Sequence, residues 1–297
     1  MTQSRLGLMG AAMLLWTGTA QAQERIIDAD DPVMTFTVDG QEAAFEVTPD
    51  APGSPVLSAP FAERLGLEGS MVAGVRMIGT TKLRAQSNLV RIDLGTSKPE
   101  KRRAFFFDTE AWRYRGDGIL GPVSLPDPVI TYRLRDAQEG EREVTLPLVE
   151  HKRGGFYIRL PIGDDYIPTF FTFEREETMA NAAAGAMLAQ AYGARMEGEA
   201  RDLHIEFGIE RPVRSLVFQN GFTLGELPVT NVVVRSQDTG STAAIPDEAS
   251  DPNEIVVAGG KAKTEPRLSI GTGSLKRCSS LSFDRKAEVI RLSCKLD

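Results

Sequence analysis

A stretch of this chain occurs twice along the sequence, and this duplication restricts the fold more than any other feature does. Phe36–Gly40 (FTVDG) and Arg159–Gly163 (RLPIG) each begin a pair of strand-like runs, at an offset of 123 residues (163 − 40). Val56–Ser58 (VLS) and Met179–Asn181 (MAN) keep this offset, and in both copies the last residue can cap a following helix. With only two copies, the pattern predicts a duplicated lobe rather than a solenoid.

The ends of the two copies also match. Gly118–Leu125 (GILGPVSL) resembles Leu268–Leu275 (LSIGTGSL), with shared glycine, serine and leucine at an offset of 150 residues (271 − 121). The offset therefore grows between the anchors. Part of this growth coincides with residues 237–253, an acidic run with glycines and prolines that is typical of an inserted loop. We predict a first lobe over residues 23–150 and a second over residues 151–297.

Strand signals dominate the sequence. Short β-branched and aromatic runs alternate with Gly, Pro or Asp turns, and a hydrophobic content of 41% is ample for packed cores. The best helix candidate is the alanine-rich segment Ala182–Tyr192, ended by Gly193, and a short helix is expected over Pro60–Leu65. We therefore predict an all-β protein with minor helices, arranged as two lobes about a pseudo-twofold axis. The predicted strands are Met34–Val38, Ala43–Val47, Leu89–Leu94, Arg103–Phe107, Val129–Leu134, Glu143–Leu148, Phe156–Leu160, Leu203–Phe207, Ser215–Phe218, Val229–Arg235 and Val289–Leu292.

The first 22 residues have the features of a secretory signal peptide. They carry one positive charge, Arg5, followed by an apolar run from Leu6 to Trp16 and the small-residue site Ala20-Gln21-Ala22, so cleavage is expected after Ala22. The apolar run is too short for a membrane helix, and no later run is long enough. We expect a periplasmic or secreted protein without an integral membrane segment.

The charge of the chain argues against nucleic acid as a partner. Without Arg5 it keeps 33 basic residues (34 − 1) and 41 acidic ones, a net charge of −8 that repels phosphates. The basic cluster Lys98–Arg103 lies between two strand-like runs, where a solvated turn is expected. The two histidines, His151 and His204, have no metal-ligand spacing around them, and we expect no metal or cofactor.

The two cysteines flank a predicted hairpin near the C-terminus. Residues whose numbers add up to 572 face one another if the turn centres on Lys286, and Cys278 and Cys294 satisfy this condition. In an oxidising compartment such a pair forms a disulfide, which stabilises a loop of this size by roughly 3 kcal/mol in the chain-entropy model. We predict that Cys278 and Cys294 are bonded to each other.

Several segments taken together resemble one known family. A strand pair with an acidic turn, then Val56–Ser58 leading into Phe61–Leu67 (FAERLGL), and later Asp117–Gly121 (DGILG) followed by Leu125, are similar to bacterial retropepsin-type aspartic peptidases. The resemblance covers nearly all of the chain after the signal peptide if the second copy is counted as a second lobe. It implies the acid-protease fold of pepsin-like enzymes, with two retropepsin-like β-barrel lobes.

The same resemblance implies where catalytic residues would lie. In that family each lobe contributes an Asp-Thr/Ser-Gly turn, and the two aspartates share one proton and activate a water. Gly121 and Gly271 match the structural glycines beneath these turns. The first turn here is Asp50-Ala51-Pro52, in which proline lacks an N–H. The gap-free register places Phe173 opposite Asp50, so the catalytic pair is predicted to be incomplete. Glu174 is the candidate replacement acid, although neighbouring residues in extended backbone point in opposite directions.

A literal Asp-Thr-Gly-Ser motif also occurs, at Asp238–Ser241. It lies within the predicted inserted loop, only 32 residues before Ile270 (270 − 238), whereas Asp50 precedes Leu120 by 70 residues (120 − 50). The shorter spacing leaves too little chain for a flap hairpin. We therefore interpret this motif as a surface turn.

The sequence leaves three functions open. The preferred one is an aspartic-peptidase-like protein without activity, whose inter-lobe cleft binds an extended peptide or protein segment by strand addition. It predicts no pepstatin-sensitive cleavage of unstructured proteins at acidic pH. The alternatives are an active aspartic endopeptidase that pairs Asp50 with Glu174, and a scaffold protein with a filled cleft. A second carboxyl group close to Asp50 would favour the enzyme.

Overall fold

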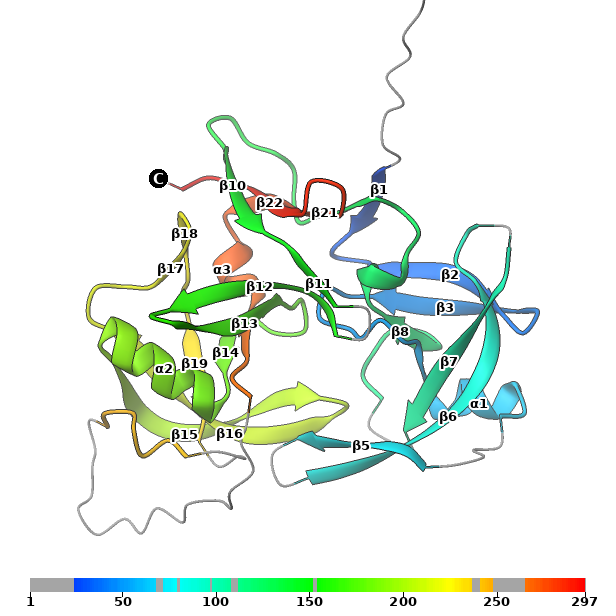
Figure 1. Cartoon of the computed structure of the whole chain (residues 1–297), viewed down its shortest axis with the longest axis horizontal. Helices are drawn as coiled ribbons and strands as arrows, with labels where there is room; N and C mark the ends of the chain where they lie inside the picture. Colours follow the sequence, from blue (N-terminus) through cyan, green and yellow to red (C-terminus); the bar gives the residue numbers. More distant parts are fainter. Residues whose placement is uncertain are drawn as a thin grey trace, which may run out of the picture.

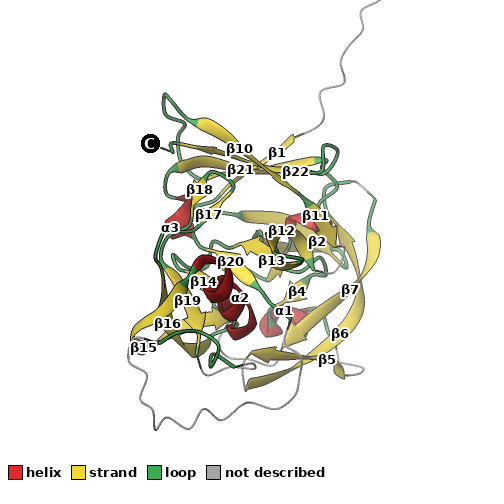
Figure 2. Ribbon diagram, turned by 60° about the vertical axis from the view of Figure 1, so that its left-hand side comes forward, coloured by secondary structure: helices red, strands yellow, loops and turns green. Residues whose placement is uncertain are grey.

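The computed structural model describes residues 24–67, 72–78, 81–96, 98–107, 112–151, 154–236, 241–247 and 265–296. This part of the chain consists mainly of strands in several sheets, with three short to medium α-helices (Figure 2). The expected class, all-β with minor helices, is confirmed. None of the described helices has the length and apolar character of a membrane span. The predicted signal peptide and Asp238–Gly240 lie outside the described residues.

The first half of the chain forms a seven-stranded sheet (Figure 1). In β3 (Gln41–Val47), Ala43, Phe45 and Val47 are buried while the residues between them are more exposed, the alternation of a strand with one face on a core. The strand order is β2 (Val33–Val38), β3, β8 (Gly118–Leu120), β4 (Val56–Leu57), β7 (Glu100–Phe107), β6 (Thr81–Asp93) and β5 (Val72–Ile78).

The second half forms an eight-stranded sheet and a separate ribbon of β17 (Thr223–Leu224) and β18 (Leu227–Pro228). The order of the large sheet is β11 (Val149–His151), β12 (Gly155–Ile162), β13 (Asp165–Phe171), β20 (Leu268–Ile270), β14 (Thr178–Ala180), β19 (Val232–Arg235), β16 (Ile209–Phe218) and β15 (Ala194–Glu206).

The two sheets repeat one strand order. The order β2, β3, β8, β4, β7, β6, β5 in the first sheet matches the order β12, β13, β20, β14, β19, β16, β15 in the second, strand by strand. The directions repeat as well: β3–β8 and β13–β20 are parallel, β4–β8 and β14–β20 antiparallel, and β4–β7 and β14–β19 parallel. The duplication seen in the sequence thus corresponds to a repeated topology.

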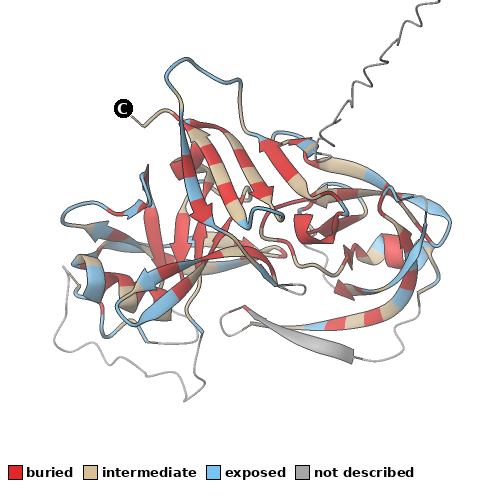
Figure 3. Cartoon of the chain, turned by 45° about the horizontal axis from the view of Figure 1, so that its top comes forward, coloured by how far each residue is buried: buried red, intermediate tan, exposed pale blue. Residues whose placement is uncertain are grey.

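A third sheet of five strands connects the two halves, in the order β1 (Glu24–Asp28), β9 (Val129–Arg133), β21 (Cys278–Asp284), β22 (Val289–Cys294) and β10 (Arg142–Pro147). Figure 3 shows buried and partly exposed residues alternating along these strands. On the buried face the ring of Phe283 stacks on that of Phe156, with centroids 5.1 Å apart. One hydrophobic core therefore includes residues from all three large sheets.

Two of the helices begin after the capping residues that the sequence predicts, and the first of them along the chain lies one residue earlier than the expected Pro60–Leu65. Helix α2 (Ala182–Tyr192) begins after Asn181, whose side chain accepts a hydrogen bond from the Ala184 amide, and ends at Gly193 with a φ of 65°. Helix α1 (Ala59–Arg64) begins after Ser58, which caps it in the same way.

The predicted disulfide between Cys278 and Cys294 is confirmed. Its register differs from the expected one, however. In the regular pairs of this hairpin, such as Leu281 with Leu292, the residue numbers add up to 573 rather than to the expected 572. An irregularity between Cys278 and Ser280 brings the two cysteines opposite each other. A bulge near one end of the hairpin therefore makes the pairing possible.

Candidate functional site

A cavity of about 410 Å³ is lined by residues of both halves of the chain. Its polar groups include the carboxyls of Asp50, in the loop after β3, and Glu174, in the loop after β13. Both candidate site residues from the sequence are thus brought to one place. The lining includes Asp50, Ile78 and Tyr114 from the first half and Glu174, Arg175 and Ile205 from the second.

The strand register makes Asp50 and Glu174 equivalent. Val47 at the end of β3 pairs with Leu120, and Phe171 at the end of β13 pairs with Ile270, so the offset here is 124 residues (171 − 47). Thr48 and Thr172 then donate their amides to Leu120 and Ile270, at 3.2 and 2.9 Å. Asp50 and Glu174 each follow two residues later, at the same offset.

The expectation that Phe173 lies opposite Asp50 is therefore wrong by one residue. The ring of Phe173 packs edge-on against Tyr132 of the core, with centroids 5.0 Å apart. Beyond the site, Val56 pairs with Ile119 and Met179 with Ser269, which restores the offset of 123 (179 − 56). The loop of the second half is one residue shorter, and this change of length falls inside the site.

Burial keeps Glu174 protonated at neutral pH. Its side chain is 12% exposed. Burial first, and the charge of Asp50 second, raise its pKa from 4.5 to about 8. Arg175 opposes this shift, with Nη2 3.8 Å from Oε2 of Glu174, and the Tyr114 hydroxyl hydrogen-bonds the carboxyl. Burial and the nearby Glu174 raise the pKa of Tyr114 far above its ordinary value.

Asp50 is held by its own loop. The Thr48 hydroxyl donates to Oδ1 of Asp50 at 3.1 Å, and the Ala51 amide donates to the Thr48 carbonyl at 3.1 Å. Asp50 is partly exposed, whereas Ala51 is buried. The site thus pairs one buried protonated carboxyl with one that is more exposed and supported by a hydroxyl.

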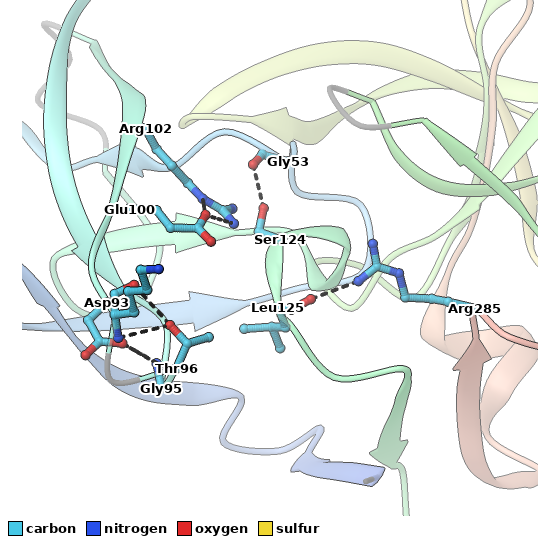
Figure 4. Close-up of polar contacts among 10 residues, drawn as sticks. Gly53, Asp93, Gly95, Thr96, Glu100, Arg102, Ser124, Leu125 and Arg285 are labelled. Atoms are coloured by element: carbon cyan, nitrogen blue, oxygen red, sulfur yellow. Dashed lines mark hydrogen bonds and ion pairs between the residues drawn. The ribbon is translucent and has the colours of Figure 1, made fainter. Parts of the chain in front are cut away.

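Gly121 and Gly271 lie directly against the two acidic loops. A Cβ on Gly121 would be 2.3 Å from the Ala51 carbonyl oxygen, and one on Gly271 would be 2.2 Å from that of Glu177. Each glycine is followed by a helical turn, η1 (Pro122–Ser124) or α3 (Thr272–Leu275). Figure 4 shows the Ser124 hydroxyl bonded to the Gly53 carbonyl, which ties η1 to the first loop.

The β5–β6 hairpin of the first half meets the β15–β16 hairpin of the second (Figure 1). Both contribute to the lining of the cavity, through Ile78 and Ile205. Arg211 at the start of β16 donates from Nε and Nη2 to the Ile78 carbonyl of β5, at 3.1 and 2.9 Å. The ring of Phe207 at the tip of the β15–β16 hairpin lies 4.6 Å from Phe107 and 5.6 Å from Tyr114, between centroids. An extended peptide that lies across both halves therefore requires these contacts to open.

The histidines serve local turns. His151 Nδ1 accepts from the Gly154 amide at 2.9 Å, and His204 Nε2 from the Gly208 amide at 3.0 Å. Sequence reasoning missed Tyr114 and Arg175 as neighbours of the acidic pair. Neither residue belongs to a recognisable motif, and only the packing of distant segments brings Tyr114 to Glu174.

Compared with known proteins, the chain matches no protein-family model and no curated relative.

Proposed function

We propose that the chain is an exported aspartic-type endopeptidase of the acid-protease fold, with Asp50 and Glu174 as its catalytic pair. The observation that carries this proposal is that two carboxyls, at equivalent positions after equivalent strands, line one cavity. The expectation of an inactive protein depended on Phe173 facing Asp50 and on the altered turn at Ala51 and Pro52, and the strand register speaks against the first of these two reasons.

The repeated strand order favours two lobes on either side of the cavity. The disulfide is compatible with a periplasmic or secreted location, because such bonds persist in oxidising compartments. The ligand in the cavity would be an extended peptide or protein segment.

The two carboxyls have different roles in this mechanism. Asp50, oriented by Thr48, acts as the general base and takes a proton from a water while the water oxygen attacks the scissile carbonyl carbon. Glu174, protonated, gives its proton to the carbonyl oxygen. The resulting tetrahedral intermediate breaks its C–N bond as Asp50 passes its proton to the leaving nitrogen, and the proton on the former carbonyl oxygen returns to Glu174.

The high pKa of Glu174 predicts an unusual pH profile. Because the acid loses its proton only near pH 8, activity should persist at neutral pH and fall as the pH rises through about 8. The test is cleavage of an unstructured protein by the purified chain from pH 3 to pH 9, with and without pepstatin.

Variants identify the residues responsible. Asp50→Asn and Glu174→Gln should each reduce the rate by roughly 10²–10⁴-fold. Glu176→Gln, which removes an exposed carboxyl two residues from Glu174, should leave it unchanged. Cleavage that survives both site substitutions, or no cleavage at any pH, would refute the proposal.

A second candidate function is peptide binding without cleavage. It is favoured by the residues next to the acids: Ala51 and Arg175 stand where the family has a hydroxyl residue, and Pro52 and Glu176 where it has glycine. Arg175 and Glu176 instead use their carbonyls, which accept from the Thr272 and Gly273 amides at 2.9 and 3.0 Å. Saturable binding of an unstructured peptide that is recovered intact would support this function.

A further inference from the structure

We propose that Arg175 binds a carboxylate of the substrate, so that the enzyme prefers peptides with a carboxylate next to the scissile bond. The inference rests on the proposed function for the cleavage step, but its binding component can be tested without cleavage. The carboxylate can belong to an Asp or Glu side chain or to the C-terminus of the peptide.

Arg175 is a buried cation with unused donors. Its side chain is 7% exposed and lines the cavity beside the acidic pair. Nη2 donates to the Ile205 carbonyl at 3.1 Å. Nε and Nη1 are buried and have no hydrogen-bond partner among the described residues. A buried guanidinium is costly unless it is paired, and it cannot release its proton as a lysine can.

The nearest acid does not satisfy this charge in the proposed mechanism. Oε2 of Glu174 lies 3.8 Å from Nη2 of Arg175, beyond hydrogen-bond distance, and it too lacks a hydrogen-bond partner in the described part of the chain. When Glu174 holds its proton, it contributes no negative charge to the pair. A carboxylate from a ligand would supply both the charge and the acceptors, and Arg–carboxylate bonds are among the strongest of protein hydrogen bonds.

The charge of the cavity permits an anionic ligand. With Glu174 protonated, the remaining acids and bases among the described residues that line it are equal in number, so an incoming carboxylate meets no excess of negative charge. They are Asp50, Glu206 and Glu265 against Arg175, Arg235 and Arg267.

The position of Arg175 also limits where the carboxylate can be. Nη2 of Arg175 lies 3.8 Å from Oε2 of Glu174, and Glu174 donates to the carbonyl oxygen of the scissile bond in the proposed mechanism. The carboxylate bound by Arg175 must therefore belong to a residue within one or two positions of that bond.

The first experiment compares matched peptides that differ only by Glu or Gln beside the cleavage site. The wild type should show a kcat/KM about tenfold or more higher for the Glu peptide, the ratio that a charged hydrogen bond implies. In Arg175→Met the ratio should fall to about one, while Arg113→Met, at an exposed arginine outside the cavity, should keep it. An unchanged ratio in Arg175→Met would overturn the proposal.

Arg175→Met should fold, because an apolar side chain of similar length replaces a buried cation. Arg175→Lys provides a second measurement: it keeps the charge but loses the planar fork, so the ratio should decrease without disappearing.

The second experiment separates this inference from the proposed function. Binding of the same peptides to Asp50→Asn is measured by fluorescence anisotropy at pH 6, with free and amidated C-termini. A preference for the Glu peptide in both terminal forms identifies a side-chain carboxylate, and a preference for the free terminus alone identifies the C-terminal one. Either preference must vanish on adding Arg175→Met. If the wild type does not cleave, the proposed function fails and this binding preference alone decides the role of Arg175. Equal binding of all peptides would refute that role.

Discussion

Replacing Glu174 by glutamine should remove a pH-dependent loss of stability. The pKa of Glu174 is raised in the folded protein from 4.5 to about 8, by burial first and by Asp50 second. The folded state therefore holds this proton more tightly than the unfolded state does. The contribution of this proton to the free energy of unfolding is fully present below pH 4.5 and is lost as the pH rises towards 8.

The magnitude follows from the two pKa values. For a single group whose pKa is near 4.5 in the unfolded chain and near 8 in the folded protein, the free energy of unfolding falls by about 2–3 kcal/mol between pH 5 and pH 7, and by about 5 kcal/mol in total. The side chain is only 12% exposed, so solvent screening reduces this little. Glutamine has the same shape and does not titrate, so Glu174→Gln should lack this loss.

The assay is urea unfolding at pH 5, 6, 7 and 8, followed by fluorescence and circular dichroism. The difference in the free energy of unfolding between Glu174→Gln and the wild type should increase steadily, in favour of the variant, as the pH rises across this range. Asp50→Asn should show a smaller increase of the same kind, because it removes the negative charge near Glu174. Glu176→Gln, at an exposed neighbour, should follow the wild type. If the curves of wild type and Glu174→Gln run parallel from pH 5 to pH 8, the reasoning about burial is wrong.

Three further predictions test the framework around the site. Gly271→Ala should cost about 1–3 kcal/mol in chemical unfolding, because the added Cβ would be 2.2 Å from the Glu177 carbonyl oxygen; a neutral effect would contradict this contact. Replacing both Cys278 and Cys294 by serine should lower the free energy of unfolding by about 3 kcal/mol, and mass spectrometry of the unreduced wild type should find no free thiol. Burial raises the pKa of Glu141, but hydrogen bonds led by two serine hydroxyls outweigh it and bring the pKa to about 2. The stability linked to Glu141 is thus present above pH 4.5 and lost as the pH falls towards 2. The free energy of unfolding of Glu141→Gln should therefore change less with pH between 4.5 and 2 than that of the wild type. The same pH dependence in both proteins would count against these hydrogen bonds.

Local features could be predicted from the sequence because their causes are local. Helix Ala182–Tyr192 has the predicted bounds, since the capping residue Asn181 and the left-handed Gly193 adjoin its ends. The predicted strands correspond to observed ones because apolar residues recur with the period of a pleated strand. Long strands such as β15 and β16, with many charged and polar residues, were recognised only in part.

The disulfide shows how far such reasoning extends. The pairing of Cys278 with Cys294 was predicted from a symmetric turn, yet the regular register of the hairpin is one residue different, and a bulge restores the pairing. The sequence located the hairpin correctly, but the position of an extra residue depends on how the strands pack.

Which residue of the second half is equivalent to Asp50 also depends on the position of a single residue. Both halves contain Val-Leu-Ser-like and Gly-containing anchors, and these were sufficient to predict a duplication and to place Asp50 in the site. The match of Gly40 with Gly163 is itself one residue out of register, because Val38 pairs with Gln41 and Ile162 with Asp165, and it therefore concealed the residue that the second copy lacks after this hairpin. The register at the site is decided by backbone pairing of β13 with β20, about a hundred residues later in the chain, which fixes Phe171 against Ile270. Because a shift of one residue turns every side chain of an extended segment to its other face, this pairing places Phe173 against the core and Glu174 in the cavity with Asp50.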